Sequence, residues 1–131
     1  MEKKLKHLEL LQAVIVRMGN NSFLLKGWSV SLVSAIFVIT IQDKAKGFIA
    51  IAFFPAFIFW ALDGFYLWQE RLFRALYDHV RGLKENQIDF SMDVSKVADD
   101  KTTWARAMFA DIPVLFHGVI LAGITILLII F

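Results

Sequence analysis

The chain has 131 residues, 58% of them hydrophobic, and a mean hydropathy of +0.61. Soluble domains of this size are usually about half apolar, so the composition excludes an ordinary water-soluble domain. Because the sequence has no cysteine, it excludes a disulfide framework, a thiolate zinc site and a cysteine nucleophile. The net charge of +2 is too small to indicate a partner.

The uneven placement of charges predicts an all-α membrane protein with three transmembrane helices. Lys26 is the only charge from 23 to 41, Asp63 is the only one from 47 to 69, and none occurs from 113 to 131. A helix of about 20 residues spans roughly 30 Å, the thickness of a hydrocarbon core. Buried helices of a soluble protein are the alternative, but the remaining polar chain is too short to cover them. The predicted spans are 22–41, 47–68 and 112–131.

Before the first span, residues 3–18 predict an amphipathic helix, because Leu5, Leu8, Leu11 and Ile15 recur every three or four residues. A short amphipathic helix with basic flanks tends to lie in the membrane interface. Packing against another cytoplasmic helix is the alternative, and we favour the interface. The sequence "GNNS" at 19–22 is expected to break this helix.

The first span carries small residues on one face, namely Gly27, Ser31, Ser34 and Ala35. Small residues four apart let helix backbones approach closely in lipid. The face is therefore a candidate for helix packing or for lining a pore. Three partners remain open: another span of the same chain, a second subunit, or the water of a hydroxyl-lined pore.

The second span is rich in aromatic residues and contains Pro55, which should bend it. Beyond the span the helix is expected to continue on the cytoplasmic side to about residue 85. Leu72, Leu76 and Val80 give this extension an apolar face, which should pack on the N-terminal helix or on a neighbouring copy. A polar connector at 86–103 then leads to the third span.

The basic residues predict the orientation, because cytoplasmic loops are enriched in Lys and Arg. Only Lys44 and Lys46 lie in the turn between the first two spans, whereas seven basic residues separate the second span from the third. We therefore place the N-terminus and the long middle segment in the cytoplasm and the C-terminus on the outer side. The seven basic residues are Arg71, Arg74, Arg81, Lys84, Lys96, Lys101 and Arg106.

Catalytic and nucleic-acid-binding motifs are missing from the sequence. It has no Gly-rich phosphate loop, no serine nucleophile elbow and no pair of histidines at ligand spacing. We therefore expect no enzyme activity, no cofactor and no metal. The seven basic residues of the middle segment are accompanied by eight acidic ones, so we expect no nucleic-acid partner.

Each span region contains one ionisable residue, and the topology places all three at a similar depth. Lys26 and His117 each lie about four residues inside a span that begins at the cytoplasm, and Asp63 lies about one turn before the cytoplasmic end of its span. Ionisable groups in a membrane usually face the protein interior and pair with one another. We expect Asp63 to pair with Lys26, within a subunit or between neighbours, with His117 close to both. These residues are therefore candidates for gating. In the alternative, Lys26 and Asp63 reach the headgroups separately.

Two stretches, "LELLQAVIVRMGNNSFLLKGWSVSLVSA" and "FWALDGFYLWQERLFRALYDHVRG", resemble segments of a family of small bacterial multi-span membrane proteins. The chain also resembles the compact membrane effectors of bacterial anti-phage loci, which a sensor protein releases to depolarise or permeabilise the inner membrane. The small-residue faces, the ionisable group in each span region and the long cytoplasmic helix favour an oligomeric channel or pore-forming effector of the inner membrane. Because three spans can barely enclose a pore, we expect a homo-oligomer, with four copies. The other function class is a non-catalytic membrane anchor for a cytoplasmic protein partner.

Overall fold

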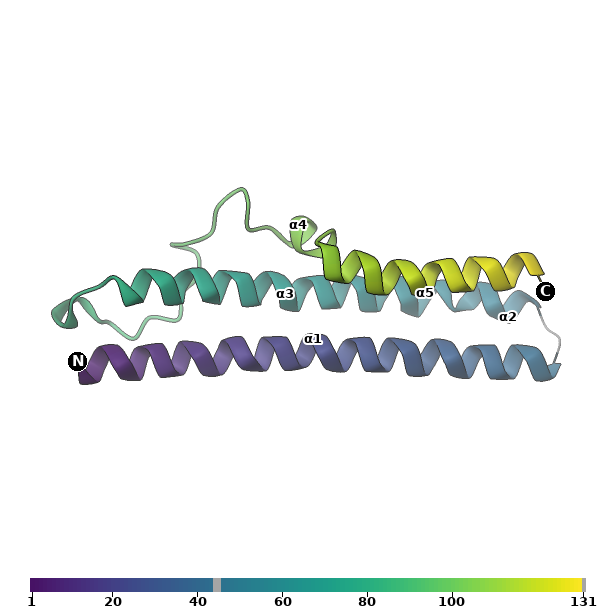
Figure 1. Cartoon of the computed structure of the whole chain (residues 1–131), viewed down its shortest axis with the longest axis horizontal. Helices are drawn as coiled ribbons and strands as arrows, with labels where there is room; N and C mark the ends of the chain where they lie inside the picture. The colour runs from purple at the N-terminus through teal and green to yellow at the C-terminus, as the bar shows by residue number, and fades with distance from the viewer. Residues whose placement is uncertain (44–45, 131) are drawn as a thin grey trace.

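The computed structural model describes residues 1–43 and 46–130 as a bundle of long helices (Figure 1). Three helical stretches are long and apolar enough to cross a membrane: Glu2–Gln42, Gly47–Arg81 and Asp111–Ile130. This result confirms the predicted all-α class with three spans. In chain order the elements are α1 (Glu2–Asp43), α2 (Lys46–Ile51), α3 (Phe53–Arg81), the 3₁₀ turn η1 (Glu85–Gln87), α4 (Trp104–Met108) and α5 (Asp111–Ile130).

Helix α1 is continuous over 42 residues, so the predicted break at 19–22 is wrong. A glycine inside a helix costs about 1 kcal/mol relative to alanine, a cost that tertiary packing can override. Here Gly19 lies beside Glu70 of α3, and the Ser22 hydroxyl donates a hydrogen bond to Asp63. Contacts with α3 therefore hold in helical form a segment whose local sequence favours a break.

The N-terminal part of α1 packs on the extension of α3. Leu11 is buried in a cluster with Leu76 and Val80, and Ile15 is also buried. The prediction that residues 3–18 form a separate interfacial helix is therefore corrected: α3 covers most of the apolar face, although Leu5 remains exposed. The structure has the packing on another helix that the alternative describes. Helix α3 ends at Arg81, close to the expected end of the extension.

Within the spans, α3 contacts both α1 and α5, and α2 contacts α5. The helix of the second span is interrupted at Ala52, between α2 and α3. Pro55 explains this position, because its nitrogen has no hydrogen to donate to the carbonyl of Ile51. The interruption is a single residue, Ala52, whose backbone angles remain helical, and the predicted bend stays a prediction. The buried core of this region is Val33, Ile49, Ala52, Ala56 and Ile124.

Three tryptophans attach the returning connector to α3. The Trp60 indole donates to the Met108 carbonyl at 2.8 Å, Trp68 donates to Thr102 at 3.0 Å, and Trp104 donates to Ala61 at 2.9 Å. Indole groups, which are apolar with one polar N–H, are enriched where a membrane meets water. Trp68 and Trp104 stack on each other with their ring centroids 6.3 Å apart, and we expect this pair, called the tryptophan belt below, to mark one membrane boundary. Trp60 lies eight residues before Trp68, deeper in the second span.

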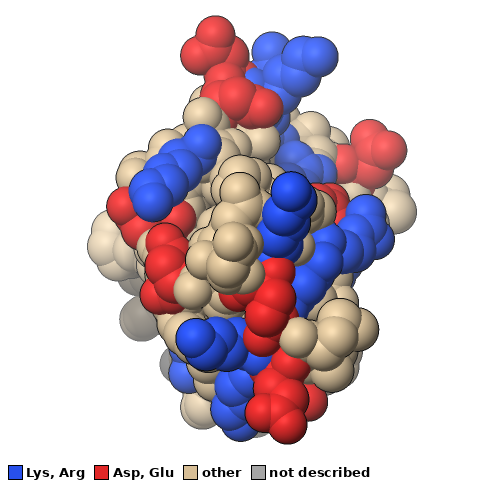
Figure 2. All heavy atoms as spheres, turned by 90° about the vertical axis from the view of Figure 1, so that its left-hand side faces the viewer, with Lys and Arg blue, Asp and Glu red and all other residues tan. Residues whose placement is uncertain are grey.

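The end of the molecule beyond the tryptophan belt is charged with both signs. Figure 2 shows Lys and Arg interspersed with Asp and Glu over this end. Glu85 accepts hydrogen bonds from the backbone nitrogens of Lys3 (2.8 Å) and Lys4 (3.3 Å), and it pairs with the Met1 amino group at 2.7 Å. The amino group and these backbone donors hold the pKa of Glu85 below its usual value. Glu85 therefore joins the start of α1 to the connector.

Gly64 sets the distance between α3 and α4. A Cβ at this position would meet the side chain of Met108 and lie 3.0 Å from its Cα. We expect Gly64→Ala to destabilise the protein by about 1–3 kcal/mol, because backbone as well as side chain must shift. Thermal unfolding in detergent measures the change. Gly118→Ala is the matched control, because a Cβ there meets nothing within 4 Å; equal losses in both variants would contradict the close contact.

The basic-residue bias predicts which end of the molecule faces the cytoplasm. The absence of native cysteine allows single cysteines to be introduced at exposed positions on opposite ends, Gln42→Cys and Asn86→Cys. In spheroplasts we expect a membrane-impermeant maleimide to label position 42 and not position 86. Permeabilised cells, in which both positions should react, are the control. Labelling of position 86 and not of position 42 would show that the orientation is the opposite of the predicted one.

Candidate functional site: a buried ion-pair network

One carboxylate links all three spans. Asp63 projects from α3 between α1 and α5. Ser22 and Lys26 lie one turn apart on α1 and therefore share the face that meets Asp63. His117 comes from the second turn of α5. Each helix of the bundle thus contributes to one site, called the Asp63 network below.

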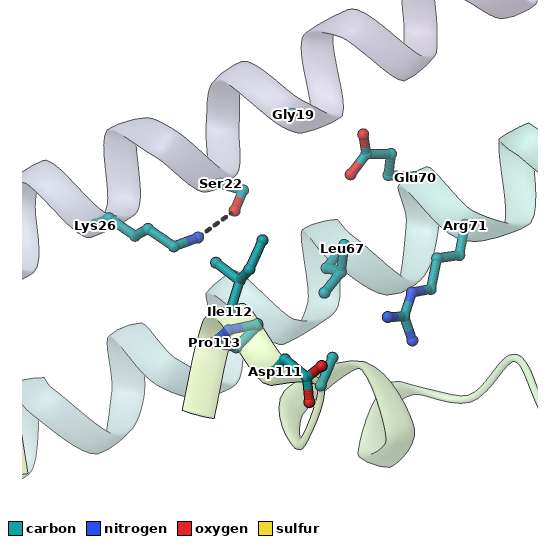
Figure 3. Close-up of a pocket in the computed structure, with 10 residues that line it drawn as sticks. Gly19, Ser22, Lys26, Leu67, Glu70, Arg71, Asp111, Ile112 and Pro113 are labelled. Atoms are coloured by element: carbon teal, nitrogen blue, oxygen red, sulfur yellow. Dashed lines mark hydrogen bonds between the residues drawn. The ribbon is translucent and has the colours of Figure 1, made fainter. Parts of the chain in front are cut away.

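Both oxygens of the Asp63 carboxylate are engaged. Its Oδ1 atom accepts from the Ser22 hydroxyl and from Lys26 Nζ, the latter at 2.9 Å. Its Oδ2 atom lies 2.7 Å from Lys26 Nζ and 2.7 Å from His117 Nε2. Lys26 also donates to the Ser22 hydroxyl at 2.8 Å, drawn as a dashed line in Figure 3.

Burial makes these contacts necessary. Asp63 is 0% exposed, His117 is 1% exposed, and the Lys26 side chain is 18% exposed. An unpaired charge at such a position would be very costly, whereas a pair with further hydrogen bonds offsets much of the cost. Aromatic rings enclose the site: Trp60 stacks on His117, and Phe116 lies 5.9 Å from Lys26 Nζ. The network is therefore a satisfied polar site inside an apolar bundle.

His117 has one engaged ring nitrogen and one without a partner. Its Nε2 faces Asp63, and its buried Nδ1 has no hydrogen-bond partner among residues 1–43 and 46–130. A neutral imidazole with its proton on Nε2 satisfies this geometry, because the bare Nδ1 lone pair costs less than a buried N–H without an acceptor. In that state the network holds one positive and one negative charge and is neutral overall.

The pairing predicted from the sequence is confirmed within one subunit. Lys26, Asp63 and His117 meet, so the alternative in which Lys26 and Asp63 reach the headgroups separately is wrong for this structure. Ser22 was missed as a site residue. Its position four residues before Lys26, on the same helix face, was the available signal.

The small-residue face of α1 does not join this site. Gly27, Ser31, Ser34 and Ala35 are all exposed, whereas the buried side of α1 carries Ser29, Val33 and Thr40. Of the three open partners, another span of the same chain is therefore ruled out. In the part of the chain that the structure describes, no group of three His, Asp or Glu side chains could hold a metal ion.

A cavity of about 430 Å³ opens beside the Asp63 network, between α1, α3 and the start of α5. Lys26 and Ser22 form part of its wall, so the network is reached from this side (Figure 3). The opposite part of the wall carries Glu70 and Arg71 of α3, with Asp111 of α5. The cavity wall therefore combines Lys26 of the ion pair with charged residues of α3 and α5.

No protein-family model, curated protein or solved structure matches this chain. The function proposed below therefore rests on the geometry of the molecule itself.

Removing one partner of the Asp63 network should cost more than removing both. Lys26→Met leaves the buried Asp63 carboxylate without its cation, and Asp63→Asn leaves Lys26, whose side chain is 18% exposed, without its anion. We expect each to destabilise the protein, by up to about 3–5 kcal/mol. The double variant should recover part of that loss. Thermal unfolding of all three proteins in detergent gives the coupling energy.

The control for this cycle is Lys6→Met, which removes an exposed ion pair with Glu9 at 3.9 Å. Exposed pairs contribute about 0–1 kcal/mol, so this variant should unfold near the wild-type temperature. A double variant whose loss equals the sum of the single losses would show that Lys26 and Asp63 act independently.

Proposed function

We propose that the chain is one subunit of a homo-oligomeric membrane channel, in which the ion path forms between copies. The observation that carries this proposal is the outward exposure of the small, hydroxyl-bearing face of α1 while the ionisable groups of the spans are paired inside the subunit. Four copies around a cyclic axis are our working number.

The interior of a single subunit does not favour conduction. Its three spans pack around an apolar core, and the ionisable groups of the spans hold one another in the Asp63 network. An ion following this route would have to displace Lys26 from Asp63 and then pass the apolar cluster around Ile49 and Ile124. A polar path therefore has to come from another surface.

The exposed face of α1 supplies such a surface. A shallow groove of about 240 Å³ includes Gly27 and Ser31, with Phe23, Leu24 and Trp28 as its large apolar borders. Small residues allow a second helix to approach closely, and serine hydroxyls in lipid gain from a polar neighbour. Copies meeting along this face would place Ser31 and Ser34 at a contact or beside a pore.

The cellular setting of the proposal comes from the resemblance and from the basic-residue bias. We place the chain in the bacterial inner membrane with the N-terminus in the cytoplasm and the C-terminus in the periplasm. The resemblance to membrane effectors adds a role in anti-phage defence, in which opening depolarises or permeabilises the membrane. In this role the protein acts on the lipid bilayer in which it is embedded, and we propose no enzymatic step.

A non-catalytic membrane anchor is the second candidate. It is favoured by the charged end beyond the tryptophan belt, where both signs of charge alternate over the surface (Figure 2). Alternating charges can hold a cytoplasmic protein partner through many separate ion pairs. An anchor needs no conduction, and this difference separates the two candidates.

Conduction by the purified protein alone is the direct test. We expect ion currents across planar bilayers, and we expect Ser31→Leu to reduce them strongly because the larger side chain crowds the proposed contact face. Val119→Leu, on an exposed position of α5, is the matched control and should conduct normally.

Assembly is measured on the same proteins. Ser31→Cys should cross-link between copies with a short bismaleimide, whereas Val119→Cys should not. A protein that stays monomeric in several mild detergents and in lipid discs would rule out the channel and leave the anchor.

A further inference from the structure

We infer that the cavity between α1, α3 and α5 binds a phospholipid headgroup that carries a phosphate and a primary ammonium group. This inference concerns a face of the subunit that the proposed α1 contact does not use, and it stands whether or not the protein conducts. Three features of the cavity carry it: its depth in the membrane, the division of its wall, and the two charges left without an ion-pair partner.

The cavity lies at the depth of the headgroups. On α3, Leu67 directly precedes Trp68 of the tryptophan belt and Arg71 lies about one turn after it, and the cavity also takes in Ala110–Pro113, where the connector enters α5. Tryptophans hydrogen-bonded through their indoles mark the boundary between hydrocarbon and water. A bilayer placed on the three spans therefore brings lipid headgroups to the mouth of this cavity.

The wall is divided between apolar and charged residues. Leu67, Ile112 and Pro113 form its apolar part. Ile112 and its neighbour on α5, Leu115, are each 70% exposed, so the apolar surface continues outward along α5. The acyl chains of a lipid could lie along that exposed apolar side while its polar head enters the cavity. The volume of about 430 Å³ lies within the range of roughly 300–1,000 Å³ that is usual for small-molecule sites.

Two charged residues of the wall are already engaged. Lys26 pairs with Asp63 at 2.7 Å, and Glu70 pairs with Arg74 at 3.0 Å. Arg71 and Asp111 remain, and among the residues that the structure describes neither makes an ion pair. Figure 3 shows both side chains at the same cavity, Arg71 from α3 and Asp111 from the start of α5.

One cation and one acid on a shared cavity complement a zwitterion. A guanidinium binds a phosphate through two parallel hydrogen bonds, and a carboxylate accepts hydrogen bonds from an ammonium group. Phosphoethanolamine offers both groups. A choline headgroup has no N–H to donate to Asp111, and a glycerol headgroup has no positive charge. Basic pockets between membrane helices on the cytoplasmic side are known to bind lipid headgroups, and the acid adds selectivity here.

The test uses the full-length protein in detergent with added lipid. Native mass spectrometry and thermal unfolding are measured with phosphatidylethanolamine, phosphatidylcholine and phosphatidylglycerol of identical acyl chains. We expect phosphatidylethanolamine to bind most tightly and to raise the unfolding temperature most. Arg71→Gln should weaken its binding about tenfold or more, as expected for loss of a charge-assisted hydrogen bond. Asp111→Asn should bring phosphatidylethanolamine close to phosphatidylcholine.

The matched control is Arg106→Gln, which makes the same change of charge on α4, at an exposed position outside the cavity wall. It should retain wild-type affinity and selectivity. Equal binding of the three lipids by the wild-type protein, or equal losses in Arg71→Gln and Arg106→Gln, would overturn the inference.

Two further measurements test whether the ligand is a lipid or a free phosphate compound, and whether Arg71 and Asp111 instead bind each other. Soluble phosphoethanolamine and inorganic phosphate, at the same concentration as the lipid, should leave the unfolding temperature unchanged; an equal rise would indicate a free phosphate compound and overturn the lipid assignment. The thermal unfolding of the double variant of Arg71 and Asp111 is measured without added lipid and compared with that of the two single variants. A strong coupling between the two positions there would mean that they bind each other, which also overturns the inference.

Discussion

The carboxylate of Asp63 is buried at the meeting point of three helices, and the rest of the bundle depends on keeping it paired. Its partners come from α1 and α5, so the carboxylate would lose a partner if either of these helices moved away from α3. Losing one partner of a buried pair typically costs 3–5 kcal/mol, which is a large part of the stability of a small protein. The Asp63 network therefore specifies which faces of the spans meet.

The same contact accounts for the straight course of α1. Gly19, Asn20 and Asn21 are poor helix formers, yet α1 passes through them because Ser22 and Lys26 on one side and Leu11 on the other are held by α3. As a result, α1 and α3 stay in contact from the Asp63 network to the charged end. Glu85 closes that end by binding the first backbone nitrogens of α1.

Pairing the ionisable groups inside the subunit has a consequence for function. The polar side chains that point outward on the spans include Ser31 and Ser34 of α1 and Thr125 of α5. The charged cavity lies on another side, where α5 begins, and there the unpaired charges are Arg71 and Asp111 among the described side chains. The two proposals thus concern different surfaces, one facing another copy and the other facing the lipid headgroups.

The sequence by itself determined the helical class, the three spans and the residues of the ion pair. Long uncharged stretches can form few structures other than helices in a membrane. A single Lys, Asp and His at one depth are expected to pair, because an unpaired ionisable group in lipid is costly. It also indicated an irregularity near Pro55, and the structure interrupts the helix at Ala52, because the effect of a missing N–H donor is local. The separate helix at 3–18 and the break at 19–22 were wrong, because local propensity there is weak and packing on α3 outweighs it.

Tertiary structure alone decided the remaining questions. The small-residue pattern of α1 could equally have faced inward, and the contacts of Lys26 with Asp63, together with the burial of Leu11 and Val33, turned Gly27, Ser31, Ser34 and Ala35 outward. The role of Ser22 and the cavity that joins Arg71 to Asp111 depend on contacts between residues about 40 positions apart. A periodic pattern gives the face of a helix, whereas the neighbour of that face is set by the packing free energy of the whole bundle.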